Sequence, residues 1–588
     1  MDKTIKKSGA WLVRYALEQI GVKQTFGIPG VHNTEIYDEL NKSETITPML
    51  VTHEGGAAFM ADAVSRTTDS IGTLMVVPAA GITHAASGIA EAHLDGIPML
   101  VVSGGVRTDG MAYQLHDMDQ HGVLAPITKA TFKIEKHSEI VETFYEAYCL
   151  SIDGEPGPVF IEVPVNIALF KGECTPPPVF DFEKYRQRLD EKQHLPEVID
   201  SANLEQVVSV INSSKKIGIF AGWGAKEATA ELISLAEHLG APVATTLQGL
   251  SVFPANHPLH VGMGFGEYAV PAAEKAFEDI DCLIAIGTRF SEIPTGSFGM
   301  KVPKNLIHVD INSDVFNANY LASISVLCDA KVFLSELVSR KSQLNQNEYS
   351  ELAQLIQQQK QAYLAEWHKA DKADKVNPAR FFTELRKMMA DDDYLVLDDG
   401  NHTFLSAELM PIHKSKHYLS PTDFNCMGYC VPAAIATKLT HPDKCVVGVV
   451  GDGAVMMTGM ELITASRYNV GVIMCVFNDG ELAQISHAQE VPYNRKTCTQ
   501  LTGLRVEGIA MATGAEYIRV DNNKQLEQAM LKAKQISATG QPVLVDVNVD
   551  YSKKTRFTKG IVKSNLKRFE FNEKVRFISR AIKRKVTG

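Results

Sequence analysis

Residues 446–480 read VVGVVGDGAVMMTGMELITASRYNVGVIMCVFNDG, and this stretch decides the fold class. An apolar run ends in the turn GDG (451–453), a segment with helical spacing follows, and a second apolar run ends in NDG (478–480). Near-continuous apolar strands that are separated by helices are typical of parallel sheets covered on both faces. In such sheets the carboxyl ends of the strands face the crevice that binds ligands.

The two turns carry residues that suit a metal ion and a diphosphate. Asp452, Asp479 and the backbone carbonyl near Glu481 offer hard oxygen ligands, which Mg²⁺ prefers together with substrate phosphates. Gly453 lets the backbone approach a diphosphate closely, and the N-terminus of the next helix favours negative charge. A single GDG is more often an ordinary turn after a strand, so the prediction depends on the spacing of the pair.

The same alternation of apolar runs and helical segments continues over most of the chain. It stops at CTPPPVF (174–180), where a polar segment predicts a linker, and again over 340–375, whose Gln, Lys and Glu residues predict a long solvated connecting helix. We therefore predict an α/β protein with three doubly wound parallel-sheet domains and a basic C-terminal helical tail. The predicted bounds are 1–185, 195–345 and 375–550 for the domains and 551–588 for the tail.

Composition and charge exclude several classes of protein. The chain has 588 residues, of which 45% are hydrophobic and 22% charged, so disordered, collagen-like and disulfide-scaffold proteins are excluded. The tail holds 13 Lys and Arg against two acidic residues and so has a net charge of +11. Because the whole chain has a net charge of −11, residues 1–550 have a net charge of −22. An acidic body of this kind argues against nucleic acid as the main partner.

Cysteine usage and hydropathy bear on location. The nine cysteines form no CxxC pair, and no second Cys/His pair completes a zinc site beside Cys426 and Cys430. The sequence shows neither a membrane-spanning run nor the apolar core of a secretory signal. We predict reduced thiols in a cytoplasmic enzyme.

The spacing of the two turns carries a family resemblance. GDG followed 26 residues later by Asn-Asp resembles the GDG…NN motif of thiamine diphosphate-dependent enzymes, with Asp479 where most members have Asn. The segment VTHEGGAAFMADAVSR (51–66) resembles RHEQGAAHMAEGYAR of acetohydroxyacid synthases. That resemblance implies that Glu54 hydrogen-bonds N1′ of the cofactor's aminopyrimidine. Protonation there lets the 4′-amino group remove the C2 proton.

Two later segments resemble the cofactor-contacting loops of the same family. DDGNHTFLSAEL (398–409) resembles its diphosphate-contacting GQH loop, and LSPTDFNCMGYCVPAA (419–434) resembles its GTMGYGLPAA segment. The resemblance implies that Met427 wedges between the two cofactor rings and that the backbone carbonyl of Asn425 faces the 4′-amino group. The implied cofactor-binding residues are Gly400, Asn401, His402, Asn425, Met427, Gly451, Gly453 and Ala454, and the implied metal ligands are Asp452, Asp479 and Glu481.

The middle block resembles the FAD-binding domain of acetohydroxyacid synthases. TTLQGLSVFPANHPL (245–259) and IGTRFSEIPTG (286–296) match family segments, although Ile293 replaces an Arg and removes one charge-assisted contact. FAD is therefore a further expectation, weakened by that replacement. The residues that match FAD-contacting segments are Gly222, Gly224, Thr246, Gly287, Arg289 and Asp310.

The substrate side departs from acetohydroxyacid synthases. His32 follows Val31 where the family has a small Gly-Ala pair, His84 replaces an Asn, and His116 stands in place of an acid while Gln114 is kept. An imidazole near the cofactor would protonate the carbanion and divert flux to simple decarboxylation, and a bulky His32 would restrict the pocket. Each histidine also has an ordinary interpretation as a hydrogen-bonded structural residue. The candidate catalytic residues are Glu54, Gln114, His32, His84 and His116.

The leading functional hypothesis is an acetolactate-synthase-like enzyme that uses thiamine diphosphate and Mg²⁺. It would decarboxylate a 2-oxo acid such as pyruvate and transfer the resulting carbanion to a second 2-oxo acid. The alternatives are a non-carboligating 2-oxo acid decarboxylase or C–C hydrolase, and a flavin-linked pyruvate oxidase. Because the family's active site lies between two subunits, the resemblance also implies a homodimer or homotetramer.

The tail has an amphipathic pattern of its own. In NEKVRFISRAIKRKV (572–586), Val575, Ile578 and Ile582 recur at helical spacing among basic residues. Three interpretations remain open: a solvated or dimer-packing extension, an active-site lid, and a contact with an anionic membrane surface.

Overall fold

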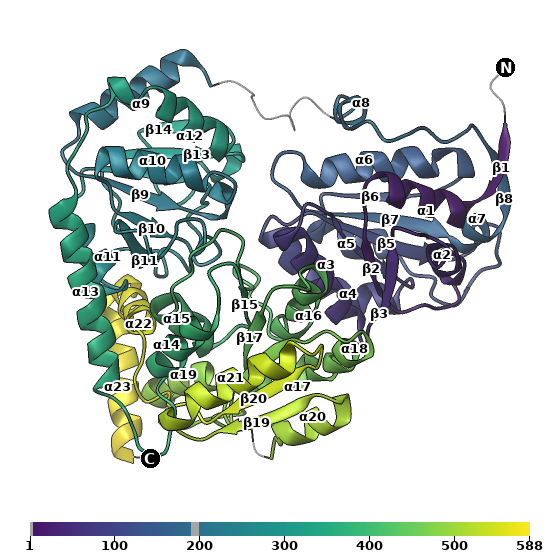
Figure 1. The fold of residues 1–588 in the computed structure, drawn as a ribbon. Coiled ribbons are helices and arrows are strands. Elements are labelled where there is room, and N and C mark those ends of the chain that lie inside the picture. The colour runs from purple at the N-terminus through teal and green to yellow at the C-terminus, as the bar shows by residue number, and fades with distance from the viewer. Residues whose placement is uncertain (1–3, 190–198, 502, 588) are drawn as a thin grey trace.

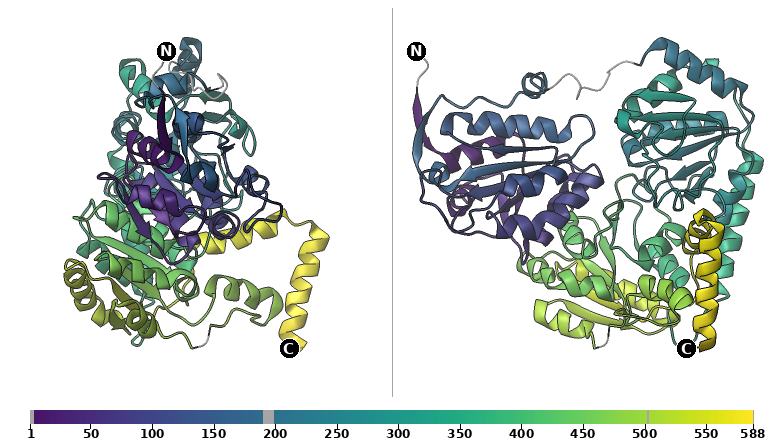
Figure 2. Two further views of the ribbon diagram at one scale, coloured as in Figure 1. Left: turned by 90° about the vertical axis from the view of Figure 1, so that its right-hand side faces the viewer. Right: turned by 180° about the vertical axis from the view of Figure 1, so that it is seen from behind.

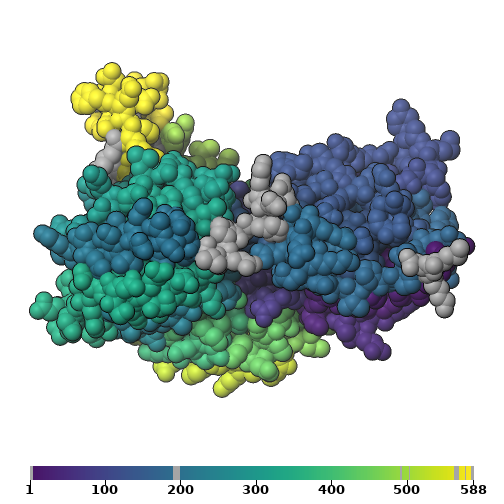
Figure 3. All heavy atoms as spheres, turned by 90° about the horizontal axis from the view of Figure 1, so that it is seen from above, coloured from purple at the N-terminus to yellow at the C-terminus, as the bar shows by residue number. Residues whose placement is uncertain are grey.

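The computed structural model describes residues 4–189, 199–501 and 503–587. Three six-stranded parallel sheets, each with helices on both faces, form three blocks along the chain (Figure 1). The N-terminal and central blocks lie side by side, as the view from above shows (Figure 3), and the C-terminal block lies beneath both. The predicted fold class is confirmed.

The N-terminal block has a doubly wound sheet. An additional antiparallel pair, β1 (Ile5–Ser8) with β8 (Lys171–Cys174), forms a separate two-stranded sheet. In spatial order its strands are β3 (Thr47–Leu50), β2 (Gln24–Gly27), β4 (Gly72–Val76), β5 (Met99–Gly105), β7 (Pro158–Pro164) and β6 (Ala130–Lys133). The main helices are α1 (Gly9–Gln19), α2 (Thr34–Leu40), α3 (Glu54–Thr67), α4 (Ala80–Leu94) and α6 (Ile140–Ile152).

The central block has the strand order of dinucleotide-binding folds. Its first strand lies in the middle of the sheet, and the chain then winds outward in both directions. In spatial order the strands are β11 (His260–Met263), β10 (Val243–Thr245), β9 (Ile217–Ala221), β12 (Cys282–Ile286), β13 (Asn305–Asp310) and β14 (Ile324–Leu327). The main helices are α9 (Ser201–Ser213), α10 (Thr229–Leu239), α11 (Pro271–Ala276) and α12 (Ala330–Ser339).

The C-terminal block repeats the strand order of the N-terminal block. The strands in spatial order are β16 (Tyr418–Leu419), β15 (Tyr394–Leu397), β17 (Val446–Gly451), β18 (Ile473–Phe477), β20 (Val543–Val547) and β19 (Glu516–Val520). The helices are α14 (Pro378–Met388), α15 (Asn401–Leu409), α16 (Cys430–Thr440), α17 (Asp452–Thr458), α18 (Leu462–Arg467), α19 (Ala483–Tyr493), α20 (Val506–Thr513) and α21 (Leu526–Ser537).

The connecting helix α13 (Ser350–His368) runs along the outside from the central to the C-terminal block (Figure 1). The prediction that this segment is solvated is wrong for one face, because Ile356, Tyr363 and Trp367 are buried. These three residues are spaced at intervals of seven and four, so they form one helical stripe against the core.

The predicted tail helix is confirmed, and it follows a second helix. α22 (Arg556–Arg568) packs at the junction of the central and C-terminal blocks, where Phe557 is buried and stacks on Phe404 at 4.5 Å. The chain then turns into α23 (Phe571–Thr587), which stands beside α19 (Figure 2). Val575, Ile578 and Ile582 on α23 are about half exposed.

α3 joins the N-terminal and C-terminal blocks within one chain. Its first turns contain small buried residues that allow close packing against α4 and α16; a Cβ on Gly88 of α4 would lie 2.5 Å from Cβ of Ala58. His53 caps the helix, since its Nδ1 accepts a hydrogen bond from the Gly55 N–H at 3.0 Å.

None of the helices in the described ranges has the length and apolar character needed to cross a bilayer.

A buried network of charged groups reinforces this junction. Arg66 donates to Asp62 and Asp95, and the Tyr429 hydroxyl donates to Asp62 at 2.7 Å. Glu91 accepts hydrogen bonds from the backbone of the 422–426 loop of the C-terminal block, at 3.2 and 3.1 Å. Burial, followed by the negative charge of Asp95, raises the pKa of Glu91 to about 9.

Replacing Glu91 by Gln is expected to flatten the dependence of stability on pH. Because the pKa of Glu91 is about 9 in the folded protein and near 4.5 as a reference, its proton stabilises the fold fully below pH 4.5. That contribution is lost as the pH rises toward 9. Urea unfolding should show the wild type losing on the order of 1 kcal/mol or more between pH 5 and 9 relative to Glu91→Gln. Exposed Glu205→Gln is the control, and identical pH profiles would refute the assignment.

Candidate active site

A pocket in the C-terminal block lies at the carboxyl ends of β15, β17 and β18, where the order of the strands reverses. It gathers all but one of the residues predicted to bind the cofactor or the metal; Asn425 is the exception. Its lining comprises Asp399, Gly400, Asn401, His402, Met427, Gly451, Asp452, Gly453, Ala454, Phe477, Asp479, Glu481, Leu482, Ala483, Gln484, Ile485 and Tyr551.

Asp452 links the two turns that were predicted from spacing. Its Oδ1 accepts a hydrogen bond from the Gly453 N–H at 2.8 Å, and its Oδ2 accepts one from the Gly480 N–H at 2.7 Å. Burial and then the negative charge of Asp452 raise the pKa of Asp479 to about 7. Two carboxylates that disfavour each other's charge at this depth form a donor set that fits a divalent cation.

The side chain of Glu481 is occupied by other partners and is not free to bind a metal. Its two oxygens accept hydrogen bonds from the Lys496 ammonium at 2.8 and 2.6 Å, and the Ser486 hydroxyl donates to it at 2.5 Å. These bonds hold the loop after Asp479 in place and lower the pKa of Glu481. A metal contact from this residue would therefore come from its backbone carbonyl, as expected from the sequence.

Three polar side chains of the pocket have buried atoms without partners among the described residues. They are Asp399 Oδ1, His402 Nε2 and Gln484 Oε1. Burial lowers the pKa of His402 to about 3, so the imidazole is neutral and offers a hydrogen bond rather than a charge. Unpaired buried polar groups are costly, and a ligand that pairs them is favoured. His402 Nε2 can donate a hydrogen bond to a phosphate, whereas the two unpaired oxygens need donors, so the pocket fits a polar cofactor that carries both kinds of group.

Gly453 and Met427 shape the floor of this pocket. A Cβ on Gly453 would come into contact with Cδ2 of Leu482 and lie 3.3 Å from Cε of Met427, so glycine keeps the space between these two side chains open. Buried Asp398, which the sequence argument did not single out, holds the turn that carries Met427. Its carboxylate accepts hydrogen bonds from the Gly428 and Cys430 N–H groups at 2.8 and 2.9 Å.

Asn425 adopts a left-handed backbone with φ of 63° just before this turn. Asn tolerates such a conformation better than most residues. Burial raises the pKa of Asp399 to about 6, and a hydrogen bond with the Asn425 side chain acts in the opposite direction. Asn425 therefore contacts the lining residue Asp399 without lining the pocket itself.

Glu54 is placed at the start of α3, in the N-terminal block, and is buried. His84 Nδ1 lies 3.0 Å from Glu54 Oε2, and the imidazole of His53 stacks on that of His84 with ring centres 4.8 Å apart. Glu54 is not among the lining residues of the C-terminal pocket. Within one chain the two halves of the predicted cofactor site are therefore separate.

A carboxylate from the C-terminal block fixes the backbone just before Glu54. Glu461 accepts hydrogen bonds from the Thr52 N–H at 3.1 and 3.2 Å and from the hydroxyl of Thr464 at 2.6 Å. Glu461 lies eight residues after the GDG turn. Its local sequence does not predict the contact, because its partner Thr52 lies 409 residues away in the chain. It is a positioning residue that sequence reasoning missed.

The other candidates of the N-terminal block form a second group. The rings of His32 and His116 meet edge-on with centres 5.2 Å apart, and His116 has a φ of 65°. Burial and the charge of His116 lower the pKa of His32, whose buried Nδ1 has no partner among the described residues. The side-chain amide of Gln114 accepts a hydrogen bond from the Arg107 N–H at 3.2 Å and donates one to the Arg107 carbonyl oxygen at 2.8 Å. His84 therefore pairs with Glu54, whereas His32 and His116 pair with each other.

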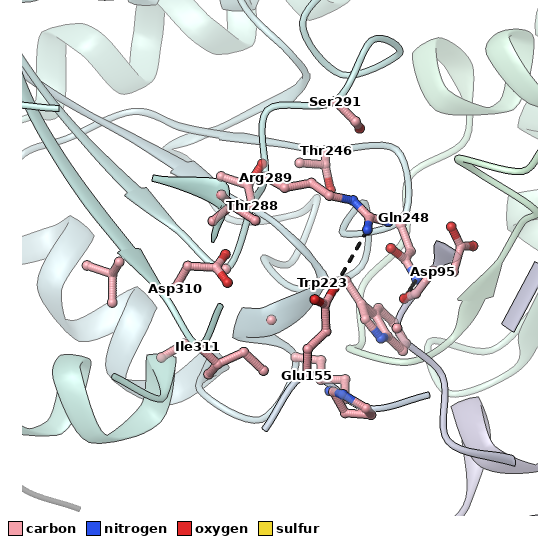
Figure 4. A pocket seen from close by; sticks show the side chains of 18 of the residues that line it. Asp95, Glu155, Trp223, Thr246, Gln248, Thr288, Arg289, Ser291, Asp310 and Ile311 are labelled. Carbon is pink, nitrogen blue, oxygen red and sulfur yellow. Dashed lines mark hydrogen bonds and ion pairs between the residues drawn. The ribbon is translucent and has the colours of Figure 1, made fainter. Parts of the chain in front are cut away.

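A larger cavity of about 350 Å³ lies at the strand-order reversal of the central block and reaches the N-terminal block. Gly224, Thr246, Gly287, Arg289 and Asp310, which resemble FAD-contacting residues, line it. Figure 4 shows Arg289 and Glu155 pointing toward each other across the cavity, with 3.6 Å between Nη1 and Oε1. Arg289 also binds Asp423 at 2.7 Å.

Comparison with known families covers all three blocks. Residues 7–123 match the N-terminal TPP binding domain of thiamine pyrophosphate enzymes, residues 204–337 match the central domain, and residues 398–547 match the C-terminal TPP binding domain. A probable acetolactate synthase large subunit of Methanocaldococcus jannaschii is 30% identical over 557 residues, which is 92% of each chain.

The chain belongs to the thiamine pyrophosphate enzyme family.

Two further relatives place this thiamine pyrophosphate enzyme within the family. The acetolactate synthase large subunit of Buchnera aphidicola subsp. Schizaphis graminum and the isozyme 3 large subunit of Escherichia coli are each 29% identical over 554 residues, covering 93% of this chain and 95% of theirs. The resemblance inferred from the sequence is confirmed, and the protein is a thiamine-pyrophosphate-dependent enzyme of the acetolactate synthase type.

Proposed function

We propose that this enzyme uses thiamine diphosphate and Mg²⁺ to decarboxylate a 2-oxo acid, with pyruvate as the first candidate, and to transfer the two-carbon unit to a second 2-oxo acid. The observation that carries the proposal is the C-terminal pocket. In that pocket the carboxylates of Asp452 and Asp479 lie among polar side chains, three of which have a buried atom without a partner in the described ranges. Gly453 leaves space beside them. The relatives named acetolactate synthase support carboligation as the reaction.

Different residues would bind the metal, the diphosphate and the aminopyrimidine ring. Asp452, Asp479 and the backbone at Glu481 would hold the metal, while His402 and the backbone at Gly453 would hold the diphosphate. When bound, thiamine diphosphate supplies the nucleophilic carbon that takes up the 2-oxo acid and stabilises the charge left by loss of CO₂. Glu54 would hold a proton toward the aminopyrimidine N1′. His84 and the cap residue His53 would keep the Glu54 carboxylate in position.

A homo-oligomer is part of the proposal. The lining residues of the pocket all lie between 399 and 551, so a Glu54 that faces the cofactor would come from a second copy of the chain. Large apolar side chains are exposed on both halves, which supports burial between copies. Those side chains are Val31, Met111, Tyr113 and Leu115 in the N-terminal block and Met456, Met457, Met460 and Ile485 in the C-terminal block.

Simple decarboxylation, or C–C hydrolysis, is the second candidate function. The imidazole of His84, 3.0 Å from Glu54, favours it because a histidine there can donate a proton where the motif of acetohydroxyacid synthases has Asn. Protonation in place of addition to a second 2-oxo acid would release an aldehyde.

Product analysis distinguishes these reactions. The protein incubated with pyruvate, Mg²⁺ and thiamine diphosphate is expected to give acetolactate, detected as acetoin after acidification. Acetaldehyde as the main product would favour decarboxylation, and acetate would indicate oxidation. No turnover of pyruvate would refute pyruvate as substrate and direct the assay to bulkier 2-oxo acids.

FAD in the central cavity stays a prediction of the resemblance. The glycines after β9 and β12 and the acid at the end of β13 support a nucleotide there. The charge of the lining is unfavourable for a diphosphate, because the six carboxyl groups of Asp95, Asp153, Glu155, Asp310, Asp329 and Asp423 outnumber the two cations Lys226 and Arg289. The mechanism therefore includes no step that depends on flavin.

Contact of the tail with an anionic membrane surface also stays a prediction. The half-exposed side chains of Val575, Ile578 and Ile582 and the basic composition of 551–588 support it. The packing of α22 between two blocks and of α23 on α19 equally supports the extension and lid interpretations.

A further inference from the structure

Tyr551 lines the C-terminal pocket, although it is the first residue of the segment predicted as the tail. It lies four residues after the end of β20, and the match to the C-terminal TPP binding domain ends before it, at residue 547. Its ring centre is 6.3 Å from that of Phe477, the last residue of β18. Neither the motifs at the strand ends nor the family segments include this tyrosine.

Hydrogen bonds fix the backbone that carries Tyr551. The preceding residue, Asp550, is buried, and its N–H donates to the carbonyl oxygen of Val376 at 2.9 Å. The carboxylate of Asp550 accepts hydrogen bonds from the Lys372 ammonium at 2.9 Å and from the Ser552 N–H at 3.1 Å. The chain on both sides of Tyr551 is therefore anchored to the segment between α13 and α14.

The hydroxyl of Tyr551 has no hydrogen-bond partner in the part of the chain that the structure describes. Two carboxylates nevertheless lie close enough for their charge to act on it, since burial, then Asp479 and then Asp452 raise the pKa of Tyr551. The phenol therefore keeps its proton and can donate a hydrogen bond. Because it bonds neither carboxylate, its acceptor would be a bound group.

The diphosphate of the proposed cofactor needs hydrogen-bond donors, and this pocket offers few from side chains. No lysine or arginine is among the described residues that line it. The negative charge of a diphosphate would therefore be balanced by the metal ion, by backbone N–H groups and by neutral donors. The neutral side-chain donors of the described lining are Asn401, His402, Gln484 and Tyr551, and Tyr551 has the only hydroxyl group among them.

We propose that the Tyr551 hydroxyl donates a hydrogen bond to the diphosphate of the bound cofactor and so contributes to its affinity. The inference rests on the proposed use of thiamine diphosphate and Mg²⁺. It makes the start of the C-terminal segment part of the cofactor site. Contact with Phe477 and the anchoring of Asp550 hold the tyrosine in place, which lowers the entropic cost of forming the bond.

Calorimetric titration of the full-length protein with thiamine diphosphate at saturating Mg²⁺ tests the contact. Tyr551→Phe removes only the hydroxyl and should weaken binding at least about tenfold, the usual effect of losing a hydrogen bond to a charged group. Inorganic pyrophosphate with Mg²⁺ is the second probe, because it contains the diphosphate alone, and its binding should weaken by the same factor.

Tyr349→Phe is the matched control and should change the binding of neither probe. The hydroxyl of Tyr349 also lacks a partner among the described residues, but it lies at the start of α13, outside the pocket. Thermal unfolding of each variant shows whether it is folded. A folded Tyr551→Phe protein with tenfold weaker binding of both probes supports the contact.

Two results would overturn the proposal while leaving the proposed function intact. One is equal affinity of the wild type and Tyr551→Phe for thiamine diphosphate. The other is a loss of thiamine diphosphate affinity that pyrophosphate does not share, which would assign Tyr551 to another part of the cofactor or to packing. A wild-type protein that does not bind thiamine diphosphate would instead refute the proposed function, and the inference with it.

Discussion

Glu54→Gln is expected to lower turnover of the 2-oxo acid substrate about 10²- to 10⁴-fold, the usual contribution of a general acid–base group. Gln keeps the size of the side chain and an oxygen that can face His84, which lies 3.0 Å from the carboxylate. It cannot hold or transfer the proton that the aminopyrimidine needs. The loss should therefore appear in the rate rather than in the folding or the affinity for thiamine diphosphate.

The rate of CO₂ release at saturating cofactor measures this effect, and cofactor binding is followed separately by protein fluorescence. Glu44→Gln, an exposed glutamate in the same block, is the matched control and should retain full activity. A Glu54→Gln protein that keeps more than a third of wild-type turnover would remove Glu54 from the catalytic role. Unaltered product formation by the control then shows that the assay itself is sound.

Asp452→Ala is expected to lower Mg²⁺-dependent activity by more than about 100-fold, since even residues that only support metal ligands contribute 10- to 100-fold. The substitution removes a proposed metal ligand, and it removes the acceptor for the Gly453 and Gly480 N–H groups, whose hydrogen bonds hold the two turns together. Loss of both interactions should weaken the binding of the metal and the binding of the diphosphate at the same time.

Asp479→Asn provides the contrast, because Asn is what most family members carry at this position. It keeps an oxygen at this position and removes the carboxyl group whose pKa is raised by burial and then by the charge of Asp452, so activity should stay within about threefold of wild type. Activity is measured against Mg²⁺ concentration after chelator treatment and re-addition. An Asp452→Ala enzyme that responds to Mg²⁺ like the wild type would refute the metal assignment.

The C-terminal pocket could be predicted from the sequence because its residues lie at the ends of strands. Parallel strands that are neighbours in one sheet bring their carboxyl ends together, so GDG and NDG had to meet once both runs were strands. The three-block architecture was predictable for a related reason, since alternating apolar strands and helices leave few ways to bury both faces of a sheet.

Contacts between blocks were beyond the reach of sequence patterns. Glu461 fixes the backbone before Glu54 across 409 residues, and Glu91 and Asp398 hold opposite sides of the loop that carries Met427. The Glu461 and Glu91 contacts depend on how one block packs on another, and the Asp398 contact joins two segments that are distant within the C-terminal block, so no local periodicity or spacing encodes them. The pairing of His84 with Glu54, and of His32 with His116, is likewise a result of the fold.

The sequence by itself determined the fold class, the family and most of the residues that line the C-terminal pocket, because these depend on local periodicity and on short motifs at strand ends. Only the tertiary structure decided which histidine contacts Glu54, that Glu54 and the pocket are separate within one chain, and that Tyr551 of the predicted tail lines that pocket. The physical reason is burial, which is a property of packed surfaces and is set by residues distant in the chain.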